Sequence, residues 1–493
     1  MVESIGIALD DFFTLQSLLY LGIGAVIGMT FALIPGLGGV TAIALLIPLT
    51  YGMESHLAIT MAGGVIGADS FTGSISSILL NTPGTAVNAA TCFDGYPLAQ
   101  KGQAGMAIGA AATASALGAV FGVVVLTAVI PIAREIVLLF GPPEFFLLAL
   151  LGLSSIAVAA YGKLLRGMLM GGLGFGLAFV GFDEVSGEIR YALGLEYLWD
   201  GVKLVPVLIG LFAIAEMIHL SVKGGTVASL QSNLKIHGVF AGVKAVFNNF
   251  PTLLRGSAIG AFVGALPGVG GAVASFLSYS VTVQLSKDPE SFGKGNIKGV
   301  IAPESSNNAK DGGSLIPTLA FGIPGSAETA VFLGLLVLHG LQPGPTLLIE
   351  HGEVIFNLIF ALAFASIFAS AVGLLCAKYL ARLTMVNVYI LTSVVPVIAL
   401  VGAYSINSSI GDVVVAVLAG IFGYLTIRYD YPRLTFVIAL VLGEIAERSF
   451  HQSMMMSDGA WSIFATRNVS VVLLVLIVLS LLFPGLRRLL RGR

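Results

Sequence analysis

Two groups of polar side chains lie beside Pro-Gly dipeptides in otherwise apolar sequence, where they are suited to binding a small carboxylate. The first group comprises Asn81, Thr82, Pro83, Gly84, Thr85 and Asn88. The second comprises Ser305, Asn308, Lys310, Ser314, Pro324, Gly325, Ser326 and Thr329. Hydroxyls and amides donate hydrogen bonds to carboxylate oxygens without the cost of burying a fixed charge. The pattern therefore predicts substrate-binding residues for an organic anion.

Two charged residues in these stretches each have a chemical and a structural interpretation. Lys310 is a candidate cationic anchor for the anion, and the alternative is a local ion pair with Asp311 or Glu304. Asp69 stands alone in an otherwise uncharged stretch. Charges inside a membrane are costly and usually functional, which favours a cation ligand or a proton carrier. The alternative for Asp69 is a helix cap at a loop, and both questions stay open at this point.

A second pair of Pro-Gly sequences interrupts apolar segments, at 35–39 and at 267–271. Broken backbone is tolerated at membrane depth only where protein or a watery cavity satisfies it. Freed helix N-termini suit a carboxylate and freed carbonyls suit Na⁺, although a kink can also serve packing alone. The candidates for holding a coupling ion are Gly36, Gly38, Gly39, Asp69, Gly268, Gly270 and Gly271. No other metal site and no cofactor is expected.

The chain reads as two copies of one unit. Pro35–Gly39 returns as Pro267–Gly271, Thr82–Ala86 as Ile323–Ala327, and Ile214-Ala215-Glu216 as Ile445-Ala446-Glu447, at offsets of 232, 241 and 231 residues. Three matches in the same order predict a duplication. Glu216 and Glu447 lie at matching places beside basic segments, which favours structural salt bridges. The predicted units are a first transmembrane repeat at 15–222, a basic linker at 223–255, a second repeat at 256–450 and a C-terminal helix at 469–484.

Composition places these units in a membrane. Hydrophobic residues make up 57% of the 493 positions, mean hydropathy is +0.98, and charged residues make up 10%. A soluble protein has about 25% charged residues. Uncharged runs long enough to span a bilayer predict an all-α polytopic membrane protein, with about 11–14 transmembrane helices or half-helices. If each half crosses an odd number of times, the two repeats are inverted, as is common in secondary transporters.

Basic residues predict the orientation. Between 217 and 262 there are four Lys or Arg and no acid, and the last ten residues carry four Arg and no acid. The linker and the C-terminus are therefore expected on the cytoplasmic side, and the acidic N-terminus outside. The near-neutral charge balance argues against nucleic-acid binding, and Cys92 and Cys376 read as buried apolar residues. The sequence lacks a zinc-protease motif and an ATP-binding loop, so uphill transport would use an ion gradient or a separate ATPase.

The combined motifs resemble those of a known family. The two Pro-Gly-x-Gly-Gly sequences occur with Asn81–Thr85, Asp94–Ala99, Glu304–Ser326 and His339–Pro345. Together they resemble the large membrane subunit of the tripartite tricarboxylate transporters, the TctA family, from about residue 20 to about residue 450.

The resemblance implies a multi-pass subunit of the bacterial inner membrane that imports citrate or related carboxylates with Na⁺ or H⁺. Its implied partners are a small TctB-like membrane subunit with four helices and a TctC-like periplasmic solute-binding protein. The alternatives are a stand-alone secondary carboxylate transporter, a channel, an intramembrane enzyme or a structural scaffold. No nucleophile, base or metal cluster supports the enzyme, and a scaffold would not need polar broken helices in both halves.

Overall fold

The computed structural model describes residues 2–34, 37–154, 163–183, 187–223, 237–383 and 388–491. Apart from a short antiparallel ribbon, β1 (Gly181–Phe182) and β2 (Ile189–Arg190), the regular elements in these residues are helices. Six helices there are long and apolar enough to cross a membrane. They are Leu15–Leu33, Ala104–Val137, Leu204–Lys223, Gly352–Ala377, Tyr389–Asn407 and Ile410–Arg428. The prediction of an all-α polytopic membrane protein is confirmed.

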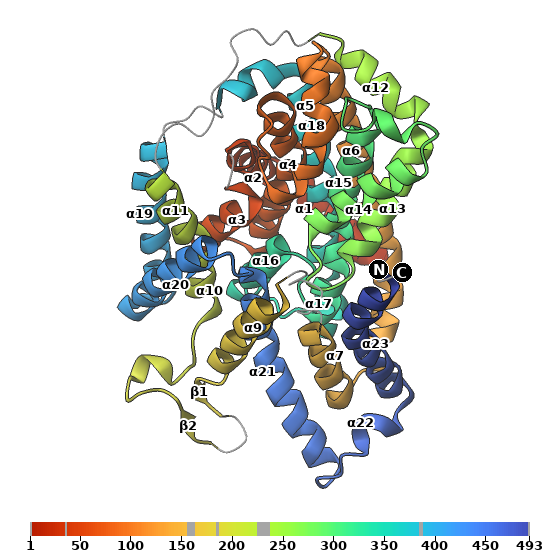
Figure 1. The fold of residues 1–493 in the computed structure, drawn as a ribbon. Coiled ribbons are helices and arrows are strands. Elements are labelled where there is room, and N and C mark those ends of the chain that lie inside the picture. Colours follow the sequence, from red (N-terminus) through yellow and green to blue (C-terminus); the bar gives the residue numbers. More distant parts are fainter. Residues whose placement is uncertain are drawn as a thin grey trace.

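A central bundle carries the two helix interruptions at Pro83-Gly84 and Pro324-Gly325, which we call the first break and the second break (Figure 1). Its helices are α1 (Val2–Phe12), α2 (Leu15–Leu33), α3 (Gly38–Leu49), α4 (Ser55–Leu80), η1 (Ala86–Asn88), α5 (Ala89–Gln100), α6 (Ala104–Val137), α12 (Val239–Asn248), α13 (Phe250–Gly264), α14 (Gly271–Gln284), η4 (Pro289–Ser291), α15 (Lys298–Phe321), α16 (Ala327–Leu338), α17 (Pro345–Glu350) and α18 (Gly352–Leu383).

Two helices that carry many polar residues, α4 and α15, lie at the centre of this bundle. Every residue of α4 from 57 to 79 is buried, and so is every residue of α15 from 299 to 320 except Ile316. Helix α2 and helix α18 pack along α4, whereas α6, α13 and α14 pack along α15. Polar side chains on these two helices are therefore enclosed by protein rather than exposed to lipid.

Glycine lets the neighbours approach α4 and α15 closely. A Cβ on Gly28 of α2 would lie 2.9 Å from the Cα of Val65 on α4. A Cβ on Gly264 of α13 would lie 3.0 Å from the Cα of Lys310 on α15. Small residues at helix crossings allow this backbone contact in membrane bundles. The close packing fixes the position of α4 and α15 relative to their neighbours.

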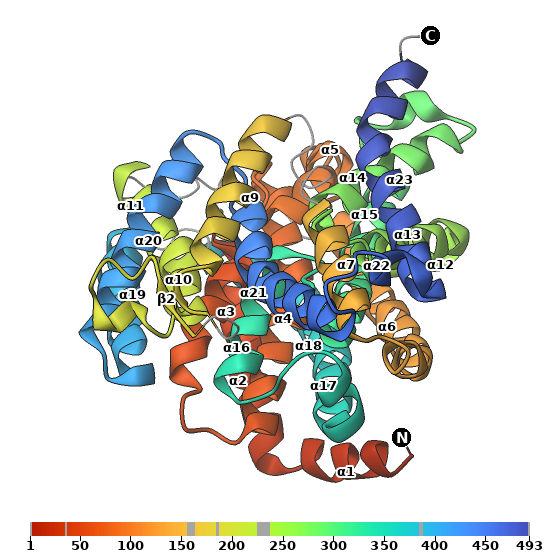
Figure 2. The ribbon, with the colours of Figure 1, turned by 90° about the horizontal axis from the view of Figure 1, so that it is seen from below.

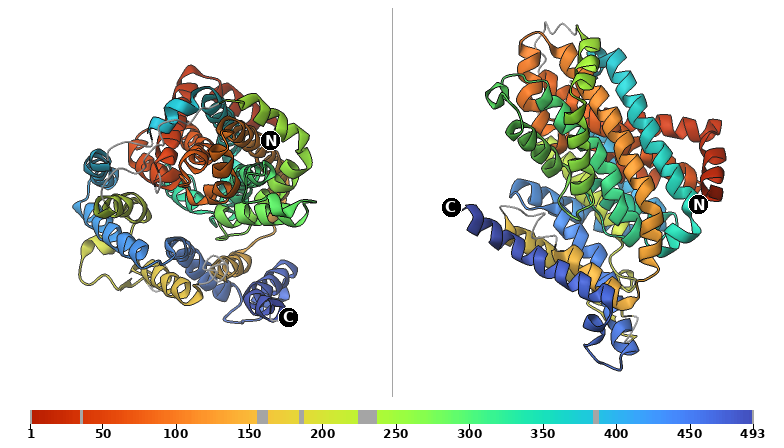
Figure 3. Two further views of the ribbon diagram at one scale, coloured as in Figure 1. Left: turned by 45° about the horizontal axis from the view of Figure 1, so that its top comes forward. Right: turned by 90° about the vertical axis from the view of Figure 1, so that its right-hand side faces the viewer.

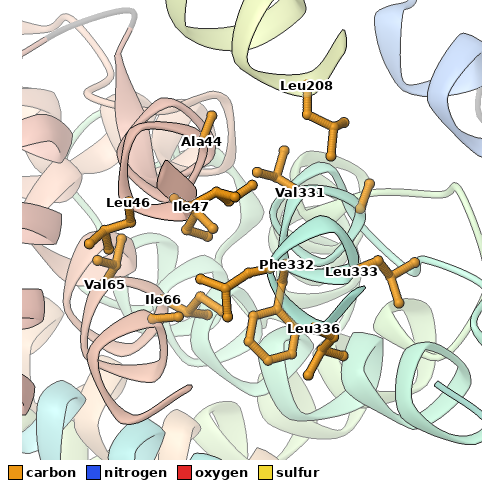
Figure 4. Close-up of a cluster of buried hydrophobic side chains, with 14 of the residues drawn as sticks. Ala44, Leu46, Ile47, Val65, Ile66, Leu208, Val331, Phe332, Leu333 and Leu336 are labelled. Carbon is orange, nitrogen blue, oxygen red and sulfur yellow. The ribbon is translucent and has the colours of Figure 1, made fainter. Parts of the chain in front are cut away.

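The two halves of the chain also pack against each other through apolar side chains. Figure 4 shows Leu46 and Ile47 of α3 facing Val331 and Phe332 of α16, with Ile66 of α4 beside them. Helix α14 packs against η1 and α5 on the other side of the bundle. Helix α3, which follows the 35–39 motif, therefore contacts α16, which follows the second break. In the same way α14, which follows the 267–271 motif, contacts η1 and α5, which follow the first break.

The remaining helices form two groups outside the bundle. One group contains α10 (Leu204–Leu208), the π-helical η3 (Ile209–Ile214), α11 (Ala215–Lys223), α19 (Val388–Asn407) and α20 (Ile410–Arg428). The other contains α7 (Pro142–Ser154), α9 (Leu164–Ala178), α21 (Arg433–Met456), α22 (Ile463–Thr466) and α23 (Asn468–Arg491). Figure 2 shows α19 and α20 on the opposite side of the molecule from α23, and the right-hand view of Figure 3 shows α23 beneath the bundle. The short η2 (Glu196–Leu198) follows the ribbon.

The two glutamates at matching positions form salt bridges, as predicted. Glu216 accepts a hydrogen bond of 2.6 Å from Arg433, whose guanidinium also donates to the Leu211 carbonyl in the π-helical turn. Glu447 pairs with Arg190 at 2.7 Å. These pairs tie α11 to α21 and α21 to the ribbon, so their role is structural.

The predicted bounds of the linker and of the C-terminal helix can be compared with the helices of the structure. Within the predicted linker, residues 224–236 lie outside the described residues, and the helix that leads into the second motif already begins at Phe250. The C-terminal helix runs from Asn468 to Arg491. The duplication and the inversion of the two halves stay predictions.

The close approach of α13 to α15 leads to a stability prediction. Gly260→Ala should lower the melting temperature in detergent, because the new Cβ would overlap the backbone of Ser306 and overpacking costs about 1–3 kcal/mol. Gly22→Ala on α2 is the matched control, since its Cβ would meet no atom within 4 Å. Equal melting temperatures for the two variants would contradict the packing described here.

Candidate functional site

The two Pro-Gly breaks have the same backbone construction. Asn81 ends α4 in the left-handed conformation with φ 54°, and Gly322 ends α15 in the same way with φ 69°. Such a residue is a common helix terminator. A Cβ on Gly84 would overlap the Ala32 carbonyl, and one on Gly325 would lie 2.7 Å from the Gly264 carbonyl. Both breaks are therefore held against the helix that packs alongside.

The first break is partly open and internally hydrogen-bonded. Asn81 is exposed, and Thr82, Pro83 and Thr85 are half-buried. The Thr85 hydroxyl donates to Asn88 Oδ1 at 2.6 Å, and the Thr82 hydroxyl donates to the Leu80 carbonyl at 3.2 Å. A solute could reach the backbone and hydroxyls of this break from outside the protein.

The second break is closed and capped by its own side chains. Ser326 and Thr329 form a capping box at the start of α16, and Pro324, Gly325 and Ser326 are all buried. The capping box satisfies backbone N–H groups that would otherwise be free to bind an anion. Ser314 packs against Gly325 and donates to the Asp311 carbonyl at 3.1 Å. The two breaks therefore differ in access although their backbones match.

Four charged side chains lie between the breaks, and we call them the ionic cluster: Asp69 of α4, Lys310 and Asp311 of α15, and Glu328 of α16. Lys310 Nζ lies 2.6 Å from Asp311 Oδ1 and 3.4 Å from Glu328 Oε2. The Ser70 hydroxyl lies 3.1 Å from Asp311 Oδ2 and 3.2 Å from Asp69 Oδ1. Within the described part of the chain, Lys310 is the basic residue that pairs with these carboxylates. The local pair of Lys310 with Asp311 is thus present, and Glu328 rather than Glu304 is its second partner.

The two Pro-Gly-x-Gly-Gly sequences at 35–39 and 267–271, which we call the glycine motifs, contact the ionic cluster and the first break through Gly38, Gly39 and Gly271. The Gly39 N–H donates to Asp69 Oδ2 at 3.0 Å. A Cβ on Gly38 would lie 2.9 Å from the Thr85 methyl group. On the other side, a Cβ on Gly271 would lie 2.8 Å from Lys310 Cε and 2.6 Å from Val87 Cγ1. The structure therefore gathers both glycine motifs, the first break, Asp69 and Lys310 in one place.

Some of the predicted site residues lie away from the ionic cluster and the first break. Ser305 packs where α15 meets Gly118 of α6 and Gly256 of α13, and its hydroxyl donates to the Ala302 carbonyl. Asn308 faces α18, where its amide donates to Ser366 at 3.3 Å. Gly268 and Gly270 have positive φ angles, of 73° and 78°, in the turn before α14. Gly36 lies outside the described residues.

Sequence reasoning did not select Ser70, Asp311 or Glu328 as site residues. Asp311 appeared only as a partner for Lys310, although its place next to Lys310 on a buried helix could have marked it. The contact between Glu328 and Lys310 depends on how the chain folds back at the second break, which no local pattern predicts. No group of three or more His, Cys, Asp or Glu suited to a metal ion occurs in the described residues.

The fold and the site define a polytopic membrane protein whose broken helices surround a buried, ion-paired polar centre. More specifically, the chain belongs to the tripartite tricarboxylate transporter TctA family, whose family model matches residues 18–438. TctA is a transporter family, which agrees with the expectation that the chain is not an enzyme. The expected resemblance is confirmed.

Two similar proteins come from Agrobacterium vitis. One, described as an uncharacterized 52.8 kDa protein in the TAR-I ttuC′ 3′ region, is 30% identical over 99% of this chain and 97% of its own length. The other, described as an uncharacterized protein in the TAR-II ttuC′ 3′ region, is 33% identical over 46% of this chain and 96% of its own length. No solved structure matches the chain.

The ionic cluster leads to a prediction that separates pairing from substrate binding. Lys310→Met should destabilise the protein by about 3–5 kcal/mol, because it leaves buried carboxylates without a counter-charge. Adding Asp311→Asn should restore part of the melting temperature.

Substrate binding by the double variant then decides the role of the lysine. If Lys310 also anchors the substrate, the stabilised double variant still binds poorly in a calorimetric titration. Wild-type affinity in the double variant would leave Lys310 with a structural role alone.

Proposed function

We propose that this chain is the large permease subunit of a tripartite transporter that imports a tricarboxylate, dicarboxylate or related organic acid, driven by an ion gradient. A TctC-like periplasmic binding protein delivers the substrate, and a small TctB-like subunit with four helices completes the membrane complex. The complex resides in the bacterial inner membrane, with the C-terminus of this chain in the cytoplasm. Family membership and the polar centre between the broken helices support the proposal.

The charge balance of the ionic cluster carries the ion-coupling part of the proposal. Among the described residues, the cluster contains three carboxyl groups, those of Asp69, Asp311 and Glu328, and one ammonium, that of Lys310, which pairs with Asp311 and Glu328. An anionic substrate adds further negative charge to this buried centre. Charge without a counter-charge is costly in a low-dielectric interior. A cation, Na⁺ or H⁺, must therefore enter with the substrate.

The substrate carboxylate binds at the first break. This break is open, and the first turns of η1 and α5 contain no acidic residue, whereas the first turn of α16 contains Glu328. Lys310 runs past Gly271, which also contacts Val87 of η1. The contact of Lys310 with Glu328 is the longer of its two ion pairs. An incoming carboxylate displaces Glu328 from Lys310 and accepts hydrogen bonds from the hydroxyls of the break.

Reconstituted transport tests the proposed function. Proteoliposomes containing this chain, the small subunit and the binding protein should accumulate labelled citrate or a dicarboxylate under an imposed Na⁺ or H⁺ gradient. Accumulation by this chain alone would instead support a stand-alone transporter. Absence of flux for a panel of carboxylates, with the ligand of the neighbouring binding protein included, would refute the anion proposal.

The hydroxyls of the two breaks provide a mutational test. Ser326→Ala, at the closed second break, should lower uptake only through the weakened start of α16, whereas Thr85→Val should remove a hydrogen bond to the charged ligand that contributes about 1.5–3 kcal/mol. That contribution corresponds to roughly a 10- to 100-fold change in affinity. Ser326→Ala also removes a helix cap worth about 1 kcal/mol, so its melting temperature is the control. Normal uptake by both variants, inserted and assembled, would show that the breaks serve packing.

A further inference from the structure

A second buried acid lies outside the ionic cluster, in the second turn of α15. Glu304 is 0% exposed and is surrounded by hydroxyl groups from three other helices. Ser74 of α4 donates to Glu304 Oε1 at 2.5 Å, Thr91 of α5 donates to the same oxygen, and Ser115 of α6 donates to Oε2 at 3.0 Å. We call these three hydroxyls the hydroxyl cage.

The hydroxyl cage contains no counter-charge. No ion pair reaches Glu304 among the residues that the structure describes. Helix α5 carries two titratable side chains near α15, the thiol of Cys92 and the carboxylate of Asp94, and Asp94 accepts hydrogen bonds from the Tyr279 hydroxyl of α14 and from the Gly295 and Asn296 N–H groups. Helices α4 and α6 present the hydroxyls of Ser74 and Ser115. Lys310, on the same helix, is already paired with Asp311 and Glu328. An ionised Glu304 would therefore be a buried charge that only neutral donors stabilise.

A proton suits this environment better than a metal ion. Uncompensated charge inside a membrane protein is expensive, so a buried carboxyl group of this kind tends to hold a proton. Hydroxyls can donate to a carboxylate and can also accept from a carboxylic acid, so the cage accommodates both states. The hydroxyl oxygens already lie at hydrogen-bond distance from the carboxyl oxygens, and a Na⁺ ion would have to push them apart.

We propose that Glu304 is the proton-binding residue of this transporter: it takes up a proton from water on one side of the membrane and releases it on the other in each transport cycle. The inference rests on the proposed function, and it assigns the coupling ion as H⁺ and the carrier as a carboxyl group separate from the ionic cluster. On uptake an O–H bond of a hydronium ion breaks as the O–H bond of Glu304 forms, and on release the Glu304 O–H bond breaks as the proton returns to water.

A chain of hydrogen bonds connects Glu304 to the proposed substrate site. The Thr85 hydroxyl donates to Asn88 Oδ1, and Asn88 Nδ2 donates to Ser74 Oγ at 2.7 Å. Ser74 in turn donates to Glu304. Thr91, another donor of the cage, lies on α5, which continues directly from the first break. Substrate at Thr85 therefore changes the donors that face Glu304, and by linkage a proton on Glu304 changes the affinity for substrate.

Glu304→Gln in the full complex tests the proton role, because the amide keeps the shape of the side chain but cannot release a proton. The variant should exchange labelled for unlabelled substrate across proteoliposomes within about twofold of the wild-type rate. It should fail to accumulate substrate under a pH gradient and should show no H⁺ flux with substrate. Such a split between exchange and accumulation is not expected from a structural defect, which would lower both.

A matched control comes from another buried acid. Glu144 of α7 is 0% exposed, but it pairs with Arg467 at 3.0 Å and lies outside the bundle. Glu144→Gln should keep H⁺-driven accumulation. If Glu304→Gln does not assemble, Glu304→Asp replaces it, and the pH at half-maximal uptake should shift relative to wild type.

The outcomes separate this inference from the function on which it rests. Accumulation and H⁺ flux at wild-type levels in Glu304→Gln would overturn the inference, as would equal loss of exchange and accumulation in a folded complex. An unchanged pH profile in Glu304→Asp would do the same. Wild-type uptake that follows Na⁺ and moves no H⁺ would overturn the inference but keep the transporter. Absence of any carboxylate flux in the wild type would refute both.

Discussion

Compensation of buried charge is the physical constraint on which the rest of this structure depends. Helix α15 carries Glu304, Lys310 and Asp311 into the centre of a membrane protein, and each of them is nearly or fully buried. Lipid offers no water to solvate such groups, so the surrounding helices must do it. Helix α4 does so with Asp69 and Ser70 around Lys310 and Asp311, and with Ser74 beside Glu304. The position of α15 thus determines where α4, α5, α6 and α16 must lie.

Glycine makes that enclosure possible. The helices around α15 approach its backbone at Gly118 and Gly122 of α6 and at Gly260 and Gly264 of α13, where any side chain would overlap. Because backbone lies against backbone at these crossings, Glu304, Lys310 and Asp311 are left to meet polar partners on α4, α5, α6 and α16. A bundle with ordinary side chains at these crossings would be wider, and water or lipid would reach the charges. Glycine at these four crossings therefore helps to keep water and lipid away from the buried charges of α15.

The sequence predicted the parts of this arrangement that depend on local chemistry. Pro-Gly dipeptides within apolar runs locate both breaks, and an isolated acid such as Asp69 in an uncharged stretch marks the buried centre. Contacts across the fold could not be predicted in this way. Nothing local indicates that Glu328 reaches back to Lys310, or that Asn308 turns toward α18. Neighbouring residues on α15 face different helices. The run of polar residues in the sequence therefore does not indicate which of them lie beside the first break.

The two kinds of buried acid have different consequences for transport. Glu328 shares Lys310 with Asp311 through the longer of the two contacts, and its side chain is 13% exposed, so an incoming carboxylate can replace it. Glu304 is fully enclosed and has no such exchange available to it. Electrostatic interactions are long-ranged in a low-dielectric interior. A negative charge at the first break therefore makes a second negative charge at Glu304 less favourable. Loading of substrate and protonation of Glu304 should then favour each other, which is the reciprocal coupling that an importer driven by a proton gradient requires.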